Sequence, residues 1–180
     1  EEIKWGTDKP NSRQLGGRKV HHLDQWESKE ADLLNERARE LFRRTANRED
    51  AEIQLSWANI YRTWDFLIPH SHRESVASIV YFLEMGDPDP DDPLSGQLAF
   101  ADPRIGRCCK EEEGYVTTLL YMDPVPGNMI IWPAPYVHYV TPYAGKRPRI
   151  TLAWNIGRLP GDEGSDKTRS NVPPTPTSRA

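Results

Sequence analysis

The sequence lacks any long apolar run and any excess of positive charge. No segment approaches the roughly 20 apolar residues of a bilayer-spanning helix, and the opening residues, EEIKWGTDKP, do not resemble a signal peptide. There are 23 Lys and Arg residues against 27 Asp and Glu residues, a formal net charge of −4. Nucleic acids and anionic membranes attract basic surfaces. We therefore expect a cytoplasmic protein that binds a small molecule, with neither nucleic acid nor membrane as a partner and with a homodimer left open.

Cysteine is nearly absent as well. The two cysteines, Cys108 and Cys109, are adjacent, so they cannot join distant segments and are interpreted as free thiols. A chain of 180 residues is long enough for one apolar core and too short to favour two. The sequence also contains no internal repeat and no glycine-rich phosphate loop. A single domain stabilised by apolar burial is expected.

Both ends of the chain lack apolar periodicity. Residues 1–22 are polar and contain Gly and Pro, which predicts an irregular arm, and residues 158–180 contain few large apolar groups, which predicts a disordered tail. The folded domain is therefore expected over residues 23–157. Within it, Leu34, Ala38, Leu41 and Phe42 follow a helical spacing, which predicts an amphipathic helix over residues 28–47, packed outside a sheet.

Helical periodicity is lost after this segment, and short β-rich runs alternate with clusters of Pro, Gly and Asp. Seven such runs are IQLSWANIYRTWDFLI, SVASIVYFLEM, GQLAFAD, YVTTLLYMD, NMIIW, YVHYVTPY and RITLAWNI. A parallel sheet would need helices between its strands, and the sequence offers none. The expected fold is mainly β, an antiparallel jelly roll with one N-terminal helix outside.

Three histidines form a candidate metal site. In PHSHRESVASIVYFL, His70 and His72 are two residues apart, and side chains at this spacing share a face of a strand. His138, near the other end of the strand-rich region, can supply a third ligand. Imidazole is a common ligand of first-row transition metals, and three protein ligands leave positions open for substrate and oxygen. Spacing alone also permits accidental or structural histidines.

A basic residue follows at the start of the last run. In RITLAWNI, Arg149, Thr151, Ala153 and Asn155 share one face. If this strand pairs with that of His138, Arg149 can hold a carboxylate in bidentate geometry close to the metal. A surface ion pair is the alternative.

Several ordered motifs together resemble the iron(II) and 2-oxoglutarate-dependent oxygenase superfamily, in particular its short bacterial and phage-type members. They are NIYRTWDFLIPHSHRESVASIVYFL, SGQLAFADPR and PVPGNMIIWPAPYVHYVTPYAGKRPRITLAWNI. The resemblance implies a cupin-like double-stranded β-helix that uses Fe(II), 2-oxoglutarate and O2. It further implies that His70 and His138 bind iron, that Arg149 binds the distal carboxylate of 2-oxoglutarate, and that Asn59 and Tyr61 contact the cosubstrate.

The chain departs from the superfamily at one position. Most members have His-x-Asp or His-x-Glu where this chain has His70-Ser71-His72, so His72 takes the place of the acidic ligand. A carboxylate from Asp65 or Asp102 is the alternative third ligand.

The reaction implied by the resemblance is hydroxylation of an unactivated C–H bond, with release of succinate and CO2. The substrate is expected to be a small molecule or an amino-acid derivative, and Arg62, Tyr121 and Asp102 are candidate contacts. Three alternatives remain: a three-histidine iron dioxygenase that needs no keto acid, a non-catalytic jelly-roll module that binds a ligand or a protein, and a halogenase.

Overall fold

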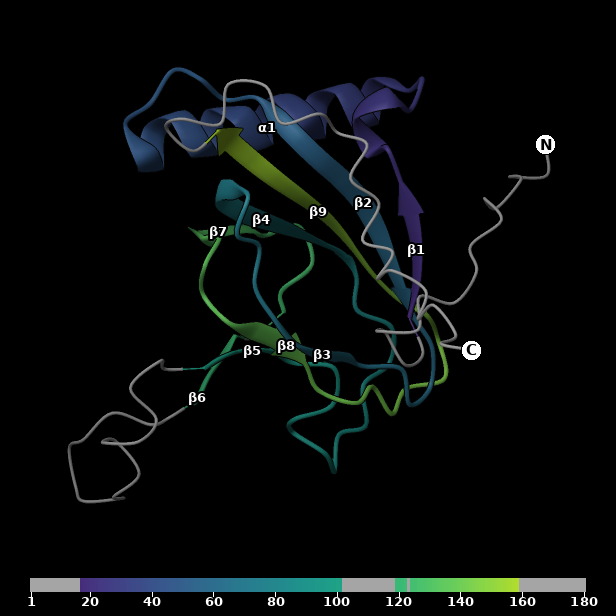
Figure 1. Ribbon diagram of the computed structural model, residues 1–180. Coiled ribbons are helices and arrows are strands. Elements are labelled where there is room, and N and C mark those ends of the chain that lie inside the picture. The colour runs from purple at the N-terminus through teal and green to yellow at the C-terminus, as the bar shows by residue number, and fades with distance from the viewer. Residues whose placement is uncertain (1–16, 102–118, 123, 159–180) are drawn as a thin grey trace, which may run out of the picture.

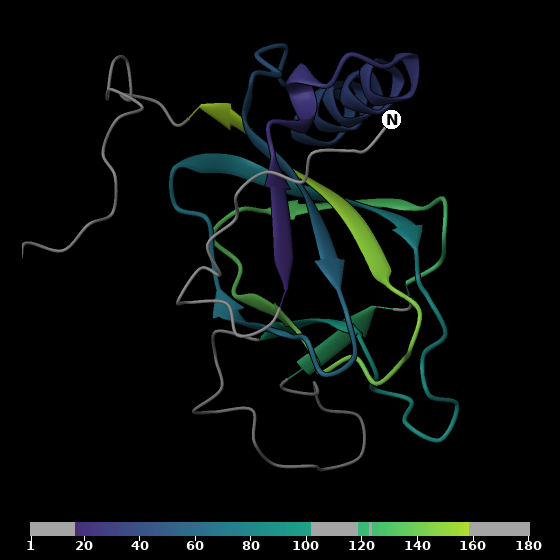
Figure 2. The same ribbon diagram turned by 90° about the vertical axis from the view of Figure 1, so that its right-hand side faces the viewer.

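Two antiparallel sheets face each other in the computed structural model, which describes residues 17–101, 119–122 and 124–158 (Figures 1 and 2). The larger sheet has the order β1-β2-β9-β4-β7 and the smaller one the order β3-β8-β5-β6. The strands are β1 (Arg18–His21), β2 (Ile53–Tyr61), β3 (Leu67–His70), β4 (Ser75–Glu84), β5 (Leu98–Ala101), β6 (Leu119–Met122), β7 (Met129–Pro133), β8 (His138–Val140) and β9 (Arg149–Arg158). This is the predicted jelly roll, in which most pairs join strands that are not consecutive, such as β2 with β9 and β3 with β8.

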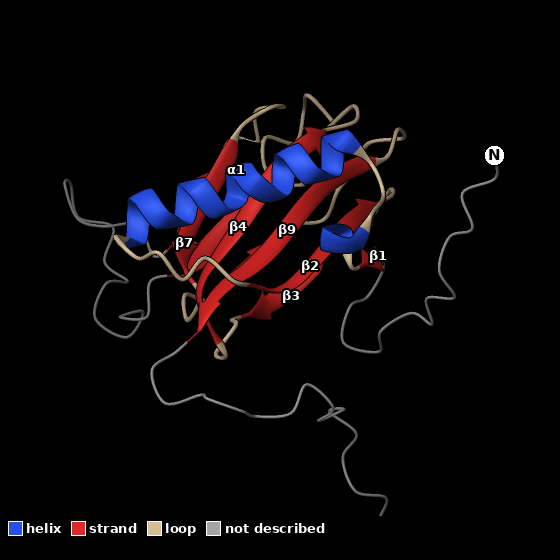
Figure 3. Ribbon diagram, turned by 90° about the horizontal axis from the view of Figure 1, so that it is seen from above, coloured by secondary structure: helices blue, strands red, loops and turns tan. Residues whose placement is uncertain are grey.

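One α-helix, α1 (Lys29–Ala46), lies across the outer face of the five-stranded sheet (Figure 3). Ser28 caps its first turn, since the Oγ accepts a hydrogen bond from the Ala31 amide at 3.0 Å. Asn47 ends the helix in the left-handed conformation, with φ of 51°. The expected helix is therefore present. Neither α1 nor the short 3-10 helix η1 (Leu23–Gln25) is long and apolar enough to cross a membrane, and the described residues form no other helix.

The helix packs on the sheet through an apolar layer with one polar contact inside it. Ala38, Phe42 and Trp154 are fully buried there. Asn35 is also buried, and its Oδ1 accepts a hydrogen bond from Trp154 Nε1 at 2.8 Å, which satisfies a polar group that would otherwise be expensive to bury. Gly157 has a φ of 79°, and a Cβ there would lie 2.5 Å from the Phe42 ring. A glycine is needed at this point because the helix approaches the sheet so closely.

A second apolar cluster fills the space between the sheets. It contains Trp57, Phe82, Leu98, Trp132 and Val140, among others. The alternation along β9 directs Arg149, Thr151, Ala153 and Asn155 to this side, while Leu152, Trp154 and Ile156 pack in the helix layer. The inter-sheet space is thus apolar over most of its surface and polar at a few positions.

Two expectations need correction. The first predicted run forms two strands in different sheets, because Arg62–Phe66 turn the chain between β2 and β3. The predicted irregular arm, residues 1–22, contains β1, which pairs with β2. As an edge strand, β1 has only Val20 as a large apolar residue, so no alternating pattern marks it. Residues 1–16 of the arm and 159–180 of the predicted tail lie outside the described residues, as do Cys108 and Cys109.

Candidate functional site

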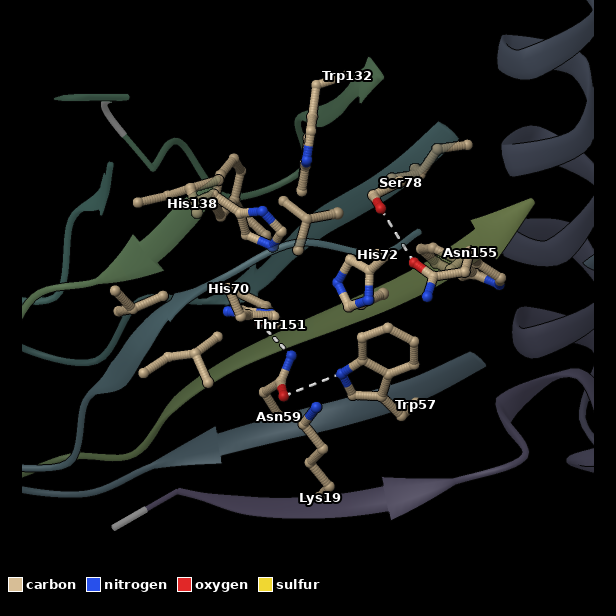
Figure 4. A pocket seen from close by; sticks show the side chains of 18 of the residues that line it. Lys19, Trp57, Asn59, His70, His72, Ser78, Trp132, His138, Thr151 and Asn155 are labelled. Atoms are coloured by element: carbon tan, nitrogen blue, oxygen red, sulfur yellow. Dashed lines mark hydrogen bonds between the residues drawn. The ribbon is translucent and has the colours of Figure 1, made fainter. Parts of the chain in front are cut away.

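The three predicted histidines come together between the sheets (Figure 4). His70 and His138 are register partners of the paired strands β3 and β8, so their side chains point to the same face. His72 lies just beyond the end of β3, where its amide donates a hydrogen bond to the Ala134 carbonyl at 2.9 Å. One ligand nitrogen from each imidazole lies within 4.8 Å of the others, a spacing that can hold a metal ion.

Backbone carbonyls set the tautomer of two of these rings. Nδ1 of His70 lies 2.9 Å from the Ile68 carbonyl oxygen, and Nδ1 of His138 lies 2.9 Å from that of Tyr136. A carbonyl can only accept, so each Nδ1 carries the proton and each Nε2 keeps a free lone pair. This arrangement of a ligating Nε2 and an Nδ1–H bound to a carbonyl is common at metal sites.

The same environment keeps the imidazoles neutral. Burial, followed by the charges of His70 and His138, lowers the pKa of His72 to about 3. Burial, followed by the charge of His70, lowers the pKa of His138 to about 4. The pKa of His70 is also lowered, chiefly by burial. Neutral imidazole is the form that binds a metal, so the cluster is ready to do so at neutral pH.

Metal-free protein should consequently lose stability in mild acid. An unfolded imidazole binds a proton below pH about 6.5, whereas His138 and His72 stay neutral in the fold until about pH 4 and 3. The unfolded state therefore binds more protons in between, and the free energy of unfolding should fall by about 1–2 kcal/mol per unit as the pH drops from 6.5 to 5. Urea unfolding with a chelator at a series of pH values measures this slope. The His72→Gln variant should show a shallower slope. An identical slope would contradict the conclusion that the pKa of His72 is lowered in the folded protein.

Of the two alternative carboxylate ligands, only Asp65 belongs to the described residues, and it is not part of the cluster. The Asp65 carboxylate accepts a hydrogen bond from the Arg62 amide at 2.8 Å and does not line the cavity. Asp102 lies outside the described residues. Among the residues that the structure describes, the metal-competent group consists of His70, His72 and His138.

Arg149 reaches the same cavity from the opposite sheet. The expected pairing of its strand with that of His138 is wrong, because β9 pairs with β2 and β4, and β8 belongs to the four-stranded sheet. The arginine and the histidines therefore meet across the space between the sheets. The sequence could not predict this arrangement, because strand order depends on the tertiary fold.

The Arg149 side chain is 1% exposed, and its Nε and Nη1 have no hydrogen-bond partner among the described residues. Its guanidinium lies 5.1 Å from the Tyr61 ring centroid, and burial raises the pKa of Tyr61 to about 12, so this phenol cannot serve as a counterion. Burial also lowers the pKa of Arg149 itself. A buried cation without an anionic partner is strongly unfavourable, which suits a site that receives a carboxylate.

A glycine makes room for this arginine. Gly96 has a φ of 66°, and a Cβ there would lie 2.9 Å from Tyr143 Cδ2 and 3.2 Å from Arg149 Cδ. Tyr143 cannot move easily because it is fully buried and its hydroxyl donates to the Arg147 carbonyl at 2.6 Å. The position of Arg149 thus depends on the missing side chain.

We expect Gly96→Ala to displace Arg149, weakening about tenfold the 2-oxoglutarate binding that the resemblance assigns to this arginine, and lowering the free energy of unfolding by about 1–3 kcal/mol. Calorimetric titration and urea unfolding measure the two effects. Gly127→Ala is the matched control, since Gly127 has a φ of 87° and a Cβ there would have nothing within 4 Å. Both variants suffer the backbone penalty, and equal 2-oxoglutarate affinity in the two would refute the steric explanation.

The other predicted site residues divide into two groups. Asn59 and Tyr61 line the cavity. Asn59 is fixed there, because its Oδ1 accepts from Trp57 Nε1 at 3.0 Å and its Nδ2 donates to Thr151 Oγ1 at 3.3 Å. Arg62 is exposed in the turn after β2, and Tyr121 is 37% exposed on β6. Neither of these two lines the cavity.

Several cavity residues were not predicted from the sequence. Lys19 enters from β1, and Ser78 donates a hydrogen bond to Asn155 Oδ1 at 3.0 Å. Trp132 is buried, its Nε1 has no partner among the described residues, and its ring lies 5.0 Å from that of His138. The sequence of β4 contained one signal for these residues, because Ser78 is a polar residue within a largely apolar run.

Comparisons with known proteins identify a family and several similar folds. The family model described as "Putative 2OG-Fe(II) oxygenase" matches residues 55–155. A prolyl-4-hydroxylase from Pseudomonas putida superposes with a TM-score of 0.61 at 19% identity, over 84% of this chain and 78% of that one. HygX from Streptomyces hygroscopicus, with nickel, 2-oxoglutarate and hygromycin B bound, superposes with a TM-score of 0.60 at 10% identity, over 84% and 73%. A search of the curated proteins found no match.

These structural neighbours share the fold at low identity, whereas the family model rests on the sequence itself. It covers more than half of the chain and spans the three histidines and Arg149. We conclude that the protein belongs to the 2OG-Fe(II) oxygenase family, whose members are enzymes that use Fe(II) and 2-oxoglutarate.

Proposed function

We propose that this oxygenase binds Fe(II) through His70, His72 and His138, binds the distal carboxylate of 2-oxoglutarate through Arg149, and hydroxylates a C–H bond of a small molecule or an amino-acid derivative. The observation that carries the proposal is the convergence, in one cavity, of three neutral imidazoles and a buried arginine with unpartnered donors. The three imidazoles suit a transition metal, and the buried arginine suits a carboxylate.

The donor set fits the cosubstrates. Three nitrogen ligands leave open positions on a first-row metal, and the Nδ1–H hydrogen bonds of His70 and His138 leave Nε2 available on both rings. Arg149 lies on the facing sheet rather than beside the histidines. A dicarboxylate that contacts both therefore spans the space between the sheets.

The residues of the chain contribute position and exclusion of water. Bound Fe(II) would supply the oxidising power together with O2, and 2-oxoglutarate would be converted to succinate and CO2. Tyr61 supports the guanidinium of Arg149 through its ring. Leu98, Val140 and Phe82 line the cavity with apolar groups, which strengthens the charge interactions by keeping water out.

The structural neighbours differ in the molecules that they act on or bind. One is a prolyl-4-hydroxylase, another has hygromycin B bound, and a third is a prolyl hydroxylase from Trichoplax adhaerens in complex with a peptide fragment of hypoxia inducible factor, similar at 19% identity with a TM-score of 0.55 over 79% of this chain and 64% of that one. Peptides and small molecules both fit this fold.

The keto-acid-independent dioxygenase is the second candidate, because the cluster contains three histidines and no carboxylate among the described residues. The match to the 2OG-Fe(II) oxygenase model argues against it, whereas Arg149 alone would suit a carboxylate of a substrate as well as that of 2-oxoglutarate. The test is succinate formation from 2-oxoglutarate by the Fe(II)-loaded protein in air, measured by NMR. Succinate that requires both Fe(II) and O2 supports the proposal. Iron binding without any conversion of 2-oxoglutarate would favour the second candidate.

A further inference from the structure

Lys19 extends from the edge strand β1 over β2 into the cavity, on the side of Trp57 and Asn59 (Figure 4). In the antiparallel register Lys19 lies opposite Asn59, so both side chains point to the cavity face. The next residue, Val20, packs in the helix layer on the other side of the sheet. Lys19 precedes the segment that the family model matches, so it is a feature that family membership does not account for.

Trp57 holds the ammonium group in place. Lys19 Nζ lies 4.6 Å from the centroid of the Trp57 ring, a cation–π distance. The ring itself is fixed, because its Nε1 donates to Asn59 Oδ1, and it lies 5.8 Å from the His72 ring. The cationic end of Lys19 is therefore held on the side of the cavity where His72 lies.

Among the residues that the structure describes, the charge at this position has no anionic partner. Among the described residues that line the cavity, Lys19 and Arg149 are the charged ones, and there is no Asp or Glu. No hydrogen bond or ion pair joins the Lys19 ammonium group to any described residue. Burial lowers the pKa of Lys19 to about 8, so the amine remains mostly protonated at neutral pH. The cavity is thus equipped with two separate cations.

These two cations enter the cavity from different strands of the five-stranded sheet. Lys19 is opposite Asn59, while Arg149 is opposite Tyr61 on the other side of β2. Two strand spacings and two residues along the strand separate their Cα atoms by about 12 Å. With Arg149 bound to 2-oxoglutarate, the positive charges of Fe(II), Arg149 and Lys19 exceed the two negative charges of that cosubstrate. The site therefore has an excess of positive charge, which favours a further anion.

We propose that Lys19 determines substrate specificity by binding a carboxylate of the prime substrate, so that the enzyme acts on organic acids in preference to their neutral analogues. This inference rests on the proposed function, in which Arg149 is occupied by 2-oxoglutarate. A charge-assisted hydrogen bond from the ammonium group should favour an acid over its amide by about tenfold or more.

Protection of Lys19 against chemical modification tests whether this residue binds a carboxylate, and the experiment does not require the identity of the substrate. The full chain, loaded with Ni(II) and 2-oxoglutarate, is treated with formaldehyde and a mild borohydride, and methylation of Lys19 is followed by mass spectrometry relative to the exposed Lys29 on α1. The probes are a pool of N-acetyl amino acids and the matching pool of N-acetyl amino-acid amides. We expect the acid pool to slow methylation of Lys19 at least threefold and the amide pool to have no effect.

Three results would overturn the proposal. Equal protection by both pools would indicate simple occlusion, and no protection by the acids would leave Lys19 without a carboxylate ligand. Full protection by 2-oxoglutarate alone would make Lys19 a cosubstrate contact. Failure of the proposed function is recognised separately, because Ni(II) and 2-oxoglutarate would then not bind in calorimetric titration.

Selectivity in turnover provides the second readout. Acids that protect Lys19 should stimulate succinate formation more than their amides do, and Lys19→Met should reduce this acid-to-amide ratio to about one. Lys19→Arg, which keeps the charge, should retain part of the ratio. Lys29→Met is the matched control and should leave the ratio unchanged. A ratio that survives in Lys19→Met contradicts the proposal, provided that the variant still binds Ni(II) and 2-oxoglutarate.

Discussion

Replacement of His138 by alanine is expected to lower the affinity for Fe(II) by roughly a hundredfold or more and to abolish turnover. Loss of a hydrogen-bonded partner of a ligand already reduces metal affinity by about 10–100-fold, and His138 is proposed to be a ligand itself. It is 4% exposed and lies 4.3 Å from His70 between ring centroids, so no solvent-exposed group can substitute for it. Calorimetric titration with Fe(II) under anaerobic conditions measures the affinity.

The control for this experiment is His22→Asn. His22 is exposed, does not line the cavity and has a φ of 62°, a backbone conformation that asparagine tolerates well. This variant should bind Fe(II) like the parent. His72→Asp should keep much of the affinity, because it restores the carboxylate that most of the superfamily has at this position. Unchanged iron binding in His138→Ala would exclude the three-histidine cluster as the metal site.

Replacement of Arg149 by methionine is expected to have an unusual combination of effects. The affinity for 2-oxoglutarate should fall by roughly a hundredfold or more, because truncating one partner of a buried charge pair costs about 2–5 kcal/mol. The affinity for Fe(II) should change little, since the histidines lie on the facing sheet. The free energy of unfolding of the ligand-free protein should stay constant or rise by about 1 kcal/mol, because an apolar side chain replaces a buried cation that has unpartnered donors.

Arg62→Met serves as the control for charge alone. Arg62 is exposed in the turn after β2, so its loss should affect neither binding nor stability. Calorimetric titration and urea unfolding on the ligand-free variants separate the two contributions. If Arg149→Met were strongly destabilised and bound 2-oxoglutarate normally, Arg149 would be a structural residue rather than a carboxylate receptor.

The fold could be predicted largely from local patterns. The helix was evident from the spacing of Ala38 and Phe42, and the cavity face of β9 followed from the period-two alternation that begins at Arg149. The edge strand β1 left no such signal, since Lys19 points inward and only Val20 is a large apolar residue. Local sequence patterns indicate a strand through the alternation of buried apolar residues. An edge strand with a polar inner face buries few apolar residues and therefore shows no such alternation.

The site was predictable in composition but not in arrangement. His70, His138 and Arg149 were identifiable from ordered motifs, and the structure brings all three to one cavity. Their placement on facing sheets depends on strand order, which no local pattern encodes. The contribution of Lys19 and the orphaned Nε1 of Trp132 likewise became visible only in three dimensions. The assignment of ligand and cosubstrate roles to these residues stays a prediction.

Anaerobic titration of the apo protein with Fe(II) and then 2-oxoglutarate tests the central claim most directly. The chelate of 2-oxoglutarate on a histidine-bound iron should give a weak charge-transfer band in the visible range. We expect the band in the parent protein, its loss in His72→Ala and its appearance only at much higher 2-oxoglutarate concentration in Arg149→Met. A band of full intensity and affinity in both variants would contradict the assignment of a three-histidine iron site with Arg149 as the carboxylate receptor.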